Sequence, residues 1–288
     1  MVGISAKSDK HRSVKHAPKG QSSPALGTLP TRRTESDNNV ETIERKSLLY
    51  KSGLGFYCIN HVLGCAHGCR YPCYAYMMAR HHGRVATQAQ WQEPRLVANA
   101  LALLEKELAR RKQKPDEVHL CLTTDPFMRG YPEVTNVSLR IIALLHAHGV
   151  AASVLTKGLL PAALGDAQRY GAHNTYGISL VSLDEGFRKR WEPHAATYRR
   201  RIAALQRLHR AGCRTLVHIE PYPTPNLIDQ DLLELLEPVA FVDEIYFSGW
   251  NYNPVVRKFA DPATFYLEQA GLVRRFCARH GIRCDADA

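Results

Sequence analysis

Alternating strand-like and helix-like segments run through most of this chain. Short stretches rich in β-branched and aromatic residues are followed by segments with apolar residues at helical spacing. This alternation is typical of βα units, whose strands lie parallel in one sheet. The predicted strands are residues 55–60, 118–123, 151–156, 175–181, 214–220 and 241–248.

A helix is predicted after each strand. The first has apolar residues between Val97 and Leu108 and a start near Pro94, and others are predicted at 137–148, after Pro161, and at 197–211, 230–236 and 263–279. Six such units are two fewer than a closed eightfold barrel contains. The sequence therefore predicts an α/β fold, a partial (β/α)6 TIM-type barrel with outer helices, for a core domain at residues 47–288.

The segment before this domain is basic. Residues 1–33 contain seven Lys or Arg against Asp9 alone, in a chain whose net charge is +11. The segment is also rich in Ser, Gly and Pro, so residues 1–46 are predicted to form a disordered tail. It is interpreted as a solubility feature rather than a nucleic-acid contact, because no aromatic residue is interleaved for base stacking.

The length of the apolar runs and the number of cysteines indicate the cellular location. No apolar run approaches the roughly 20 residues of a membrane span, and residues 1–8 lack the apolar region of a signal peptide. We therefore expect a soluble, cytoplasmic protein with no membrane partner. In that compartment, eight cysteines indicate metal or redox chemistry rather than disulfides.

Three of these cysteines lie close together. Cys65, Cys69 and Cys73 are bordered by Gly, His and Tyr and follow the first predicted strand. Thiolate is the soft ligand that zinc and iron–sulfur clusters select. Because no fourth cysteine is near, three thiolates would leave one coordination position open, as in catalytic metal sites. The spacing alone is compatible with zinc or with iron.

Polar residues end most of the predicted strands. In parallel α/β sheets the active site forms beyond the carboxyl ends of the strands, and the cysteine loop lies on this same rim. A charge at such an end needs a partner, so a pocket facing the cysteines is expected. Its candidate residues are Thr123, Thr124, Asp125, Lys157, Ser179 and Glu220.

Taken in order, these blocks resemble the radical S-adenosylmethionine superfamily, and more narrowly the branch that includes spore photoproduct lyase. The resemblance runs from about Tyr50 to Asn253. Each block is weak alone, and the specific signal is their order at the expected strand ends. The blocks are residues 64–71, 124–127, 155–158, 177–180, 192–195, 201–212 and 219–221.

The resemblance implies a 4Fe–4S cluster held by Cys65, Cys69 and Cys73, with S-adenosylmethionine on the open iron. Reductive cleavage of this cofactor would give a 5′-deoxyadenosyl radical, which would abstract a hydrogen atom from an unidentified substrate. The implied partners are a reductant such as ferredoxin or flavodoxin and an unidentified substrate. The basic stretches at 188–190 and 199–201 are interpreted first as the solvated outer face of a helix. The alternative is contact with a phosphate-bearing or nucleic-acid substrate.

The cysteine spacing departs from the superfamily's usual pattern. Three residues separate each pair of cysteines, because Pro72 lies between Tyr71 and Cys73. Proline fixes φ and lacks an N–H, so the loop path must differ locally. The resemblance implies an aromatic side chain against the adenine, and the insertion leaves Tyr71 and Tyr74 as alternatives.

The resemblance also implies the other cofactor contacts. Thr123, Thr124 and Asp125 would contact the methionine amino group, and Lys157 the methionine carboxylate. Ser179, with Ser182 as a further candidate, would lie near the ribose. Arg201 or Arg199 would supply a second cation, and Glu220 would accept from the cofactor hydroxyls.

No catalytic residue is assigned from the sequence. Cys121 lies one residue too early for the hydrogen donor of the lyase branch, because strand side chains alternate between faces, and it is expected to be a buried core thiol. Two other functions remain open. One is the same chemistry acting on nucleic acid; the other is a noncatalytic zinc protein that binds nucleic acid, which leaves Asp125 and Lys157 unexplained.

Overall fold

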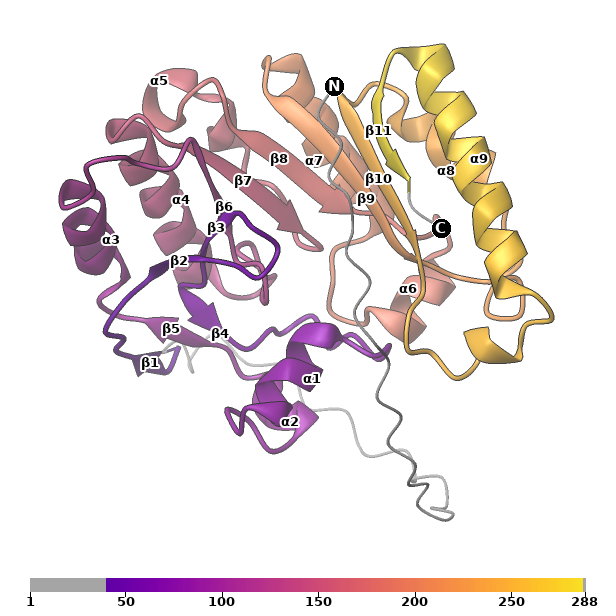
Figure 1. The fold of residues 1–288 in the computed structure, drawn as a ribbon, viewed down its shortest axis with the longest axis horizontal. Helices are drawn as coiled ribbons and strands as arrows, with labels where there is room; N and C mark the ends of the chain where they lie inside the picture. The colour runs from indigo at the N-terminus through magenta and orange to yellow at the C-terminus, as the bar shows by residue number, and fades with distance from the viewer. Residues whose placement is uncertain (1–39, 287–288) are drawn as a thin grey trace, which may run out of the picture. The chain divides into compact units, whose positions relative to one another are not determined.

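One mostly parallel sheet organises the chain. The computed structural model describes residues 40–286, and its main sheet has the strand order β11-β10-β9-β8-β7-β6-β3-β2 (Figure 1). All neighbours pair in parallel except β2 with β3. The strands are β2 (Leu49–Lys51), β3 (Tyr57–Ile59), β6 (Glu117–Leu120), β7 (Ala151–Thr156), β8 (Thr175–Ser179), β9 (Arg214–Tyr222), β10 (Glu244–Gly249) and β11 (Arg283–Ala286).

The six predicted strands are β3 and β6 to β10, adjacent in the sheet and in chain order. The predicted partial (β/α)6 architecture is therefore confirmed. The edge strands β2 and β11 were not predicted. Both are short, and β11 alternates exposed and half-buried residues, so it carries no apolar run.

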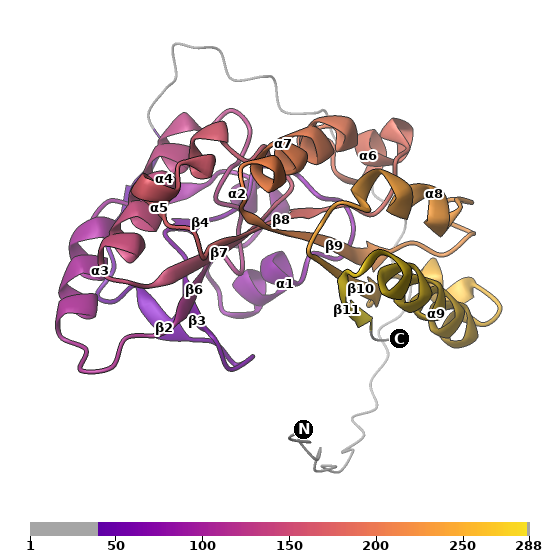
Figure 2. The same cartoon turned by 90° about the horizontal axis from the view of Figure 1, so that it is seen from above.

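Helices follow the strands as predicted, and Figure 2 shows α4, α5, α6 and α7 on one side of the sheet and α1 on the other. The predicted ones are α3 (Ala100–Ala109), α4 (Pro132–Ala147), the 3₁₀ turn η1 (Ala162–Gly165) with α5 (Ala167–Tyr170), α7 (Tyr198–Arg210), α8 (Leu232–Leu236) and α9 (Pro262–His280). Two further 3₁₀ turns are η2 (Glu237–Val239) and η3 (Val256–Lys258). Among the described residues, no helix combines the length and apolarity needed to cross a membrane.

A second, three-stranded sheet lies beside the first βα unit, in the order β1 (Thr42–Ile43), β5 (Arg95–Val97), β4 (Val62–Leu63). The start of a helix was expected near Pro94, but Leu96 N donates to Glu41 O (2.8 Å) and Val97 N to His61 O (2.9 Å), so helix α3 begins only at Ala100. Residues 1–39 of the predicted tail lie outside the described residues, whereas residues 40–46 contain β1.

Three short helices were not predicted: α1 (Tyr74–His81), α2 (Gln88–Trp91) and α6 (Glu185–Trp191). Helix α1 directly follows the cysteine loop, and Cys73 is its N-cap residue. Helix α6 begins after Asp184, whose side chain accepts from Phe187 N. These helices position the residues on both sides of the cysteine loop.

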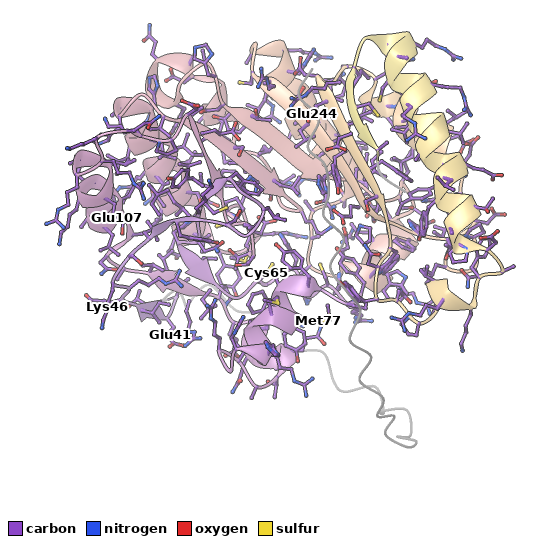
Figure 3. All side chains as sticks on the ribbon, in the orientation of Figure 1. Glu41, Lys46, Cys65, Met77, Glu107 and Glu244 are labelled. Carbon is purple, nitrogen blue, oxygen red and sulfur yellow. The ribbon has the colours of Figure 1, made fainter. Side chains whose placement is uncertain are left out.

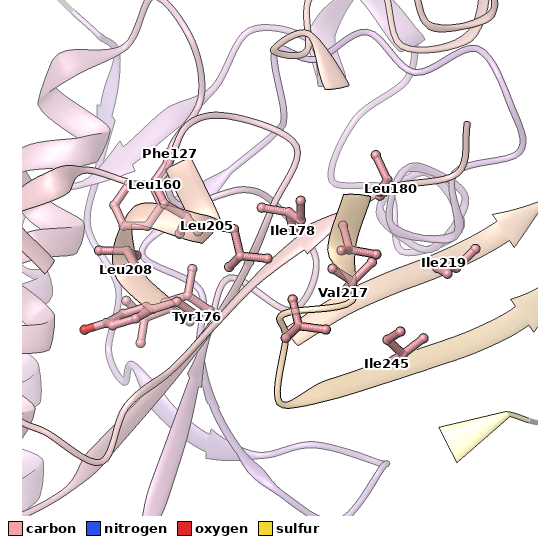
Figure 4. Close-up of a cluster of buried hydrophobic side chains, with 14 of the residues drawn as sticks. Phe127, Leu160, Tyr176, Ile178, Leu180, Leu205, Leu208, Val217, Ile219 and Ile245 are labelled. Carbon is pink, nitrogen blue, oxygen red and sulfur yellow. The ribbon is translucent and has the colours of Figure 1, made fainter. Parts of the chain in front are cut away.

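The main core lies between the sheet and the outer helices. Val217 and Ile219 of β9 are fully buried there beside Ile178 of β8 and Ile245 of β10, and Leu205 of α7 packs over them (Figure 4). The alternate residues of β9 are only half-buried, so they face the opposite, inner side of the sheet.

Candidate functional site

Two glycines shape the backbone of the cysteine loop. Gly64 (φ +93°) and Gly68 (φ +65°) occupy the left-handed region that glycine enters without strain. A Cβ at Gly64 would lie 2.7 Å from Trp91 O, and Cys65 N donates to that same oxygen (2.8 Å). The start of the loop thus packs closely against the end of α2.

The three thiols lie on this loop between the small sheet and α1, where Figure 3 labels Cys65. All three are half-buried, and the charge of each thiolate acts on the others. Burial raises the pKa of Cys69 to about 12, and the nearby Lys157 ammonium opposes this rise. A metal bound here would therefore displace protons from the thiols.

Within residues 40–286, no three Cys, His, Asp or Glu side chains stand together at metal-ligand spacing. The donor set nevertheless fits an iron–sulfur cluster, because three neighbouring thiols on a glycine-bent loop offer three soft ligands and no fourth. The chemistry of the donors, and not their present geometry, supports the assignment.

Asp125 ties the loop to the sheet. Its Oδ1 accepts from Phe127 N (2.8 Å) and Thr156 Oγ1 (2.7 Å), and its Oδ2 accepts from Lys157 N (2.8 Å). Nε2 of His67 lies 2.8 Å from Oδ2, within ion-pair distance. These partners lower the pKa of Asp125 although burial opposes the shift. The carboxylate is engaged on both oxygens and therefore positions the loop.

Glu192 is a second fully buried carboxylate beside the loop. Its Oε1 accepts from Tyr71 Oη (3.0 Å) and Lys157 Nζ (2.8 Å), and its Oε2 from Arg201 Nη2 (2.6 Å). Arg201 and Lys157 hold the pKa of Glu192 well below its usual range against the effect of burial. Two cations thus face one carboxylate, so a charge of +1 remains beside Cys69.

Lys157 and Arg201 differ in what they can still contact. Lys157 keeps part of its side chain exposed (16%), and its ammonium lies 5.3 Å from the centre of the Tyr71 ring. Arg201 has no exposed surface, and its guanidinium also donates to the backbone oxygens of Ala196 (2.9 Å) and Ser179 (2.8 Å). Arg201 is thus bound to Glu192 and to two backbone oxygens, and its predicted contact with the cofactor stays a prediction.

Aromatic rings support the loop from the core. Trp250 packs edge-on against Tyr71 (5.3 Å between ring centres) and against Trp191 (5.1 Å). Trp191 O also accepts from Arg70 N in the loop (2.9 Å). The loop is therefore anchored to α6 and to the end of β10.

The two candidate aromatic residues have different surroundings. Tyr71 is buried and bound to Glu192, whereas Tyr74 is exposed and its hydroxyl donates to Leu122 O. Burial raises the pKa of Tyr74, and the charge of Cys73 raises it further. Of the two, Tyr74 has more ring surface free for a ligand.

The remaining predicted residues surround this rim. Strand β6 ends at Leu120 rather than at Thr123, because Cys121 takes φ 60° and Thr124 N turns back to its oxygen (3.1 Å). Thr123 N donates to Asn60 Oδ1 (3.3 Å), and Thr124 Oγ1 donates to Val62 O (3.4 Å). Ser179 is buried at the end of β8, and Cys121 is a buried thiol, as expected.

The inner face of the sheet carries a neutral polar surface. His218 stacks on Tyr246 (4.1 Å between ring centres, 9° between planes), and its Nδ1 lies 3.5 Å from Glu220 Oε2. Burial lowers the pKa of His218 to about 3 and that of His119 to about 4, so both imidazoles are uncharged at neutral pH. Burial raises the pKa of Glu220, and Lys157 opposes the rise.

Sequence reasoning missed Glu192 as a functional residue, although it lies in one of the blocks that carry the family resemblance. It follows a helix and not a strand, so no strand end marks its position. Its only sequence signal is one acid inside the basic stretch from Arg188 to Arg201. Such an acid is a candidate for a buried ion pair.

Comparison with known proteins gives matches in sequence and in structure. The family model of the Radical SAM superfamily matches residues 59–239, which include all three loop cysteines, Lys157 and Glu220. Among solved structures, spore photoproduct lyase complexed with dinucleoside spore photoproduct superposes with a TM-score of 0.64 over 84% of this chain and 80% of that one. The two sequences are 16% identical, so this likeness shows the shared fold.

Two relatives are uncharacterized proteins. One, from Mycobacterium tuberculosis (strain ATCC 25618 / H37Rv), is 29% identical over 195 residues, which are 64% of this chain and 55% of the relative. The other, from Acidianus two-tailed virus, is 24% identical over 192 residues, 64% of this chain and 61% of the relative. The chain thus matches little more than half the length of the first relative. The family match covers more than half of the present sequence, and this chain belongs to the radical SAM superfamily.

Proposed function

We propose that this chain is a radical SAM enzyme that holds a 4Fe–4S cluster through Cys65, Cys69 and Cys73. When bound and reduced, the cluster supplies one electron that cleaves S-adenosylmethionine into methionine and a 5′-deoxyadenosyl radical, which abstracts a hydrogen atom from the substrate. The observation that carries this proposal is a three-thiol loop on the carboxyl rim of a parallel barrel, beside the partly exposed cation Lys157.

Each nearby residue has a proposed task. Lys157 binds the methionine carboxylate, since Glu192 fixes its ammonium and some of its surface stays exposed. Tyr74 supplies the ring against the adenine, because Tyr71 is buried and bound to Glu192. Ser179 and Glu220 serve the ribose, and Thr123 and Thr124 border the methionine amino group.

Asp125 and Arg201 act through other residues. Asp125 orients His67 and the backbone of Lys157, and so fixes the loop relative to β7. Arg201 orients Glu192, which in turn orients Lys157 and Tyr71. The barrel interior then shields the reacting atoms from water and stray hydrogen donors.

The inner face favours a compact substrate over nucleic acid. Burial lowers the pKa of His119 to about 4 and that of His218 to about 3, so both are neutral at pH 7, and Glu220 adds a carboxyl group rather than a cation. A phosphodiester backbone needs Lys or Arg contacts, and two arginines of the basic stretch, Arg188 and Arg201, are buried. The eight cysteines are free thiols, which suits a reducing compartment such as the cytoplasm.

Anaerobic reconstitution with iron and sulfide tests this function. The wild-type chain should bind about four irons and turn brown, and dithionite with S-adenosylmethionine should yield 5′-deoxyadenosine. Cys69→Ala should lose both properties. Cys213→Ala is the matched control, because this half-buried thiol lies outside the loop, where it contacts Leu164 O (3.7 Å).

Two results would contradict the proposal. A colourless chain that binds one zinc and no iron would identify a zinc protein. A Cys69→Ala variant with wild-type iron content and product yield would show that the cluster lies elsewhere.

A further inference from the structure

An exposed basic surface lies on the outer side of the cysteine loop. It consists of Arg70, Arg129, Arg190 and His194, all exposed to solvent, and is called here the loop-side basic surface. These residues come from three separate segments: the cysteine loop, the connection between β6 and α4, and the end of α6 with the three residues that follow it. Their convergence is therefore a product of the fold and not of sequence proximity.

Backbone contacts bring the members to the loop. Arg70 is the residue after Cys69, and its N–H donates to Trp191 O (2.9 Å). His194 N donates to His67 O (3.1 Å), and its ring lies so close to Gly68 that a Cβ there would be 2.9 Å away. Arg129 follows Met128, whose Sδ accepts from Ala66 N (3.2 Å).

The two buried acids beside the cysteine loop do not pair with this surface. Asp125 faces inward to His67, and Glu192 faces inward to Lys157 and Arg201. Both carboxylates are buried. Burial lowers the pKa of His194, and the charges of Arg70 and Arg129 lower it further, so the positive charge of this surface comes from its arginines. Arg190 extends the surface, with its guanidinium 5.5 Å from the centre of the Trp191 ring.

The inner side of the loop is chemically different. There the Tyr74 hydroxyl donates to Leu122 O, and the rings of His218 and Tyr246 stack on the inner face of the sheet. A substrate that reaches the barrel interior contacts this inner side. The basic charges on the outer side are therefore left for a partner other than the substrate.

We propose that the loop-side basic surface docks a small acidic one-electron carrier protein of the flavodoxin or ferredoxin class. This inference rests on the proposed function, because the cluster must be reduced by one electron before it can cleave S-adenosylmethionine. One electron passes from the reduced carrier to the oxidised cluster, the carrier is oxidised by one electron, and no covalent bond or proton is exchanged. Such redox encounters use small interfaces, and opposite charges raise their association rate.

The position of the surface favours a carrier protein over nucleic acid. Arg70 is bonded covalently to Cys69, so a protein bound at Arg70 approaches a metal ligand directly. The side chains named here offer no free aromatic platform for bases, since Arg190 covers the Trp191 ring. Nucleic-acid binding is retained as an outcome of the test.

Binding is measured first on the cluster-free chain, so that the readout does not depend on catalysis. Oxidised flavodoxin is titrated against wild type and against Arg129→Glu/Arg190→Glu, with calorimetry or flavin fluorescence as the signal. Two reversed charges should weaken binding at least about tenfold at low salt, and the wild-type affinity should fall as salt rises. Arg129→Gln/Arg190→Gln should show a smaller loss.

The matched control is Arg140→Glu/Arg275→Glu, which reverses two exposed charges in the middle of α4 and α9. It should change the affinity by less than about threefold, because long-range charge effects are screened beyond roughly a Debye length. In the reconstituted enzyme, Arg129→Glu/Arg190→Glu should lose 5′-deoxyadenosine formation driven by reduced flavodoxin and keep the formation driven by dithionite.

Three results overturn the docking proposal. They are wild-type affinity in the Arg129→Glu/Arg190→Glu variant, an equal loss in the control, and no binding of flavodoxin or of a plant-type ferredoxin to wild type. If Arg129→Glu/Arg190→Glu instead loses binding of a single-stranded 20-nucleotide DNA while it still binds flavodoxin, the surface binds nucleic acid. Failure of wild type to form 5′-deoxyadenosine with dithionite contradicts the proposed function, and the titration still decides the docking.

Discussion

Glu192 is the residue on which the polar contacts beside the cysteine loop converge. It is fully buried and accepts hydrogen bonds from Tyr71, Lys157 and Arg201. Glu192→Gln leaves the Arg201 charge buried without its counterion, so the free energy of unfolding should fall by about 3–5 kcal/mol. Urea denaturation of the cluster-free chain measures this. Glu234→Gln, at an exposed position of α8, should change it by less than about 0.5 kcal/mol.

The same residue predicts a pH dependence of stability. The pKa of Glu192 is lowered in the folded protein, so its contribution is present above its ordinary pKa of 4.5 and is lost as pH falls below that value. Wild type should lose stability between pH 5 and pH 3 more steeply than Glu192→Gln, in which this proton uptake is missing. Parallel pH profiles for the two chains, from urea midpoints, would contradict the linkage.

Single residues differ in how far the sequence reveals them. Lys157 and Glu220 follow or end strands that the apolar pattern predicts, so their place on the rim could be inferred. Glu192 and Trp250 lie in connections whose path depends on tertiary contacts, and the sequence carries no periodic signal there. The family resemblance implies a cofactor contact for Arg201. Its burial could not be foreseen without Glu192 as its partner.

The cysteine loop behaves as one element whose shape depends on glycine. In Gly64→Ala the new methyl group would lie 2.7 Å from Trp91 O, a backbone atom that cannot move aside cheaply. Backbone strain alone would cost roughly 1–2 kcal/mol. We expect the collision to shift the loop in addition, so that the iron content after reconstitution falls below about half of wild type. Iron analysis and circular dichroism separate loop displacement from global unfolding.

Gly55→Ala is the control for that change. Gly55 has the same φ of +93°, and nothing lies within 4 Å of the position that its new methyl group would take, so the variant carries the backbone strain without the collision. It should keep the wild-type iron content. Equal iron loss in both variants would show that backbone strain, and not contact with Trp91, sets the shape of the loop.

Helices and strands were predictable where burial imposes a regular spacing of apolar residues. Strands β7 to β10 are nearly continuous apolar or alternating runs, and α7 has a clear buried stripe. A helix start was expected where β5 lies. The strand was missed because its pairing partner β1 is remote in sequence and only two residues long. Helices α1 and α2 were missed because each packs on a few residues and contains little apolar repetition.

Stability is distributed unevenly over the described residues. Strand β8 is buried along its whole length in the main apolar cluster, and α7 covers it. Helix α1 packs instead in a small separate cluster made of Ala75, Ala79, Val85 and Trp91. Segments with few buried apolar contacts open at lower free energy than the core. Helix α1, whose N-cap residue is Cys73, is therefore expected to open at a lower free energy than the core in the cluster-free chain.

This difference can be measured by hydrogen exchange. In the cluster-free chain, amides of α1 should exchange at least about tenfold faster than those of β8, which corresponds to a difference of roughly 1.4 kcal/mol or more in opening free energy. Reconstitution with iron and sulfide should slow α1 selectively, because its N-cap Cys73 becomes a ligand, and should leave α9 unchanged. Cys69→Ala treated in the same way should show no slowing. If α1 is as protected as β8 before reconstitution, the loop is already rigid and the cluster does not order it.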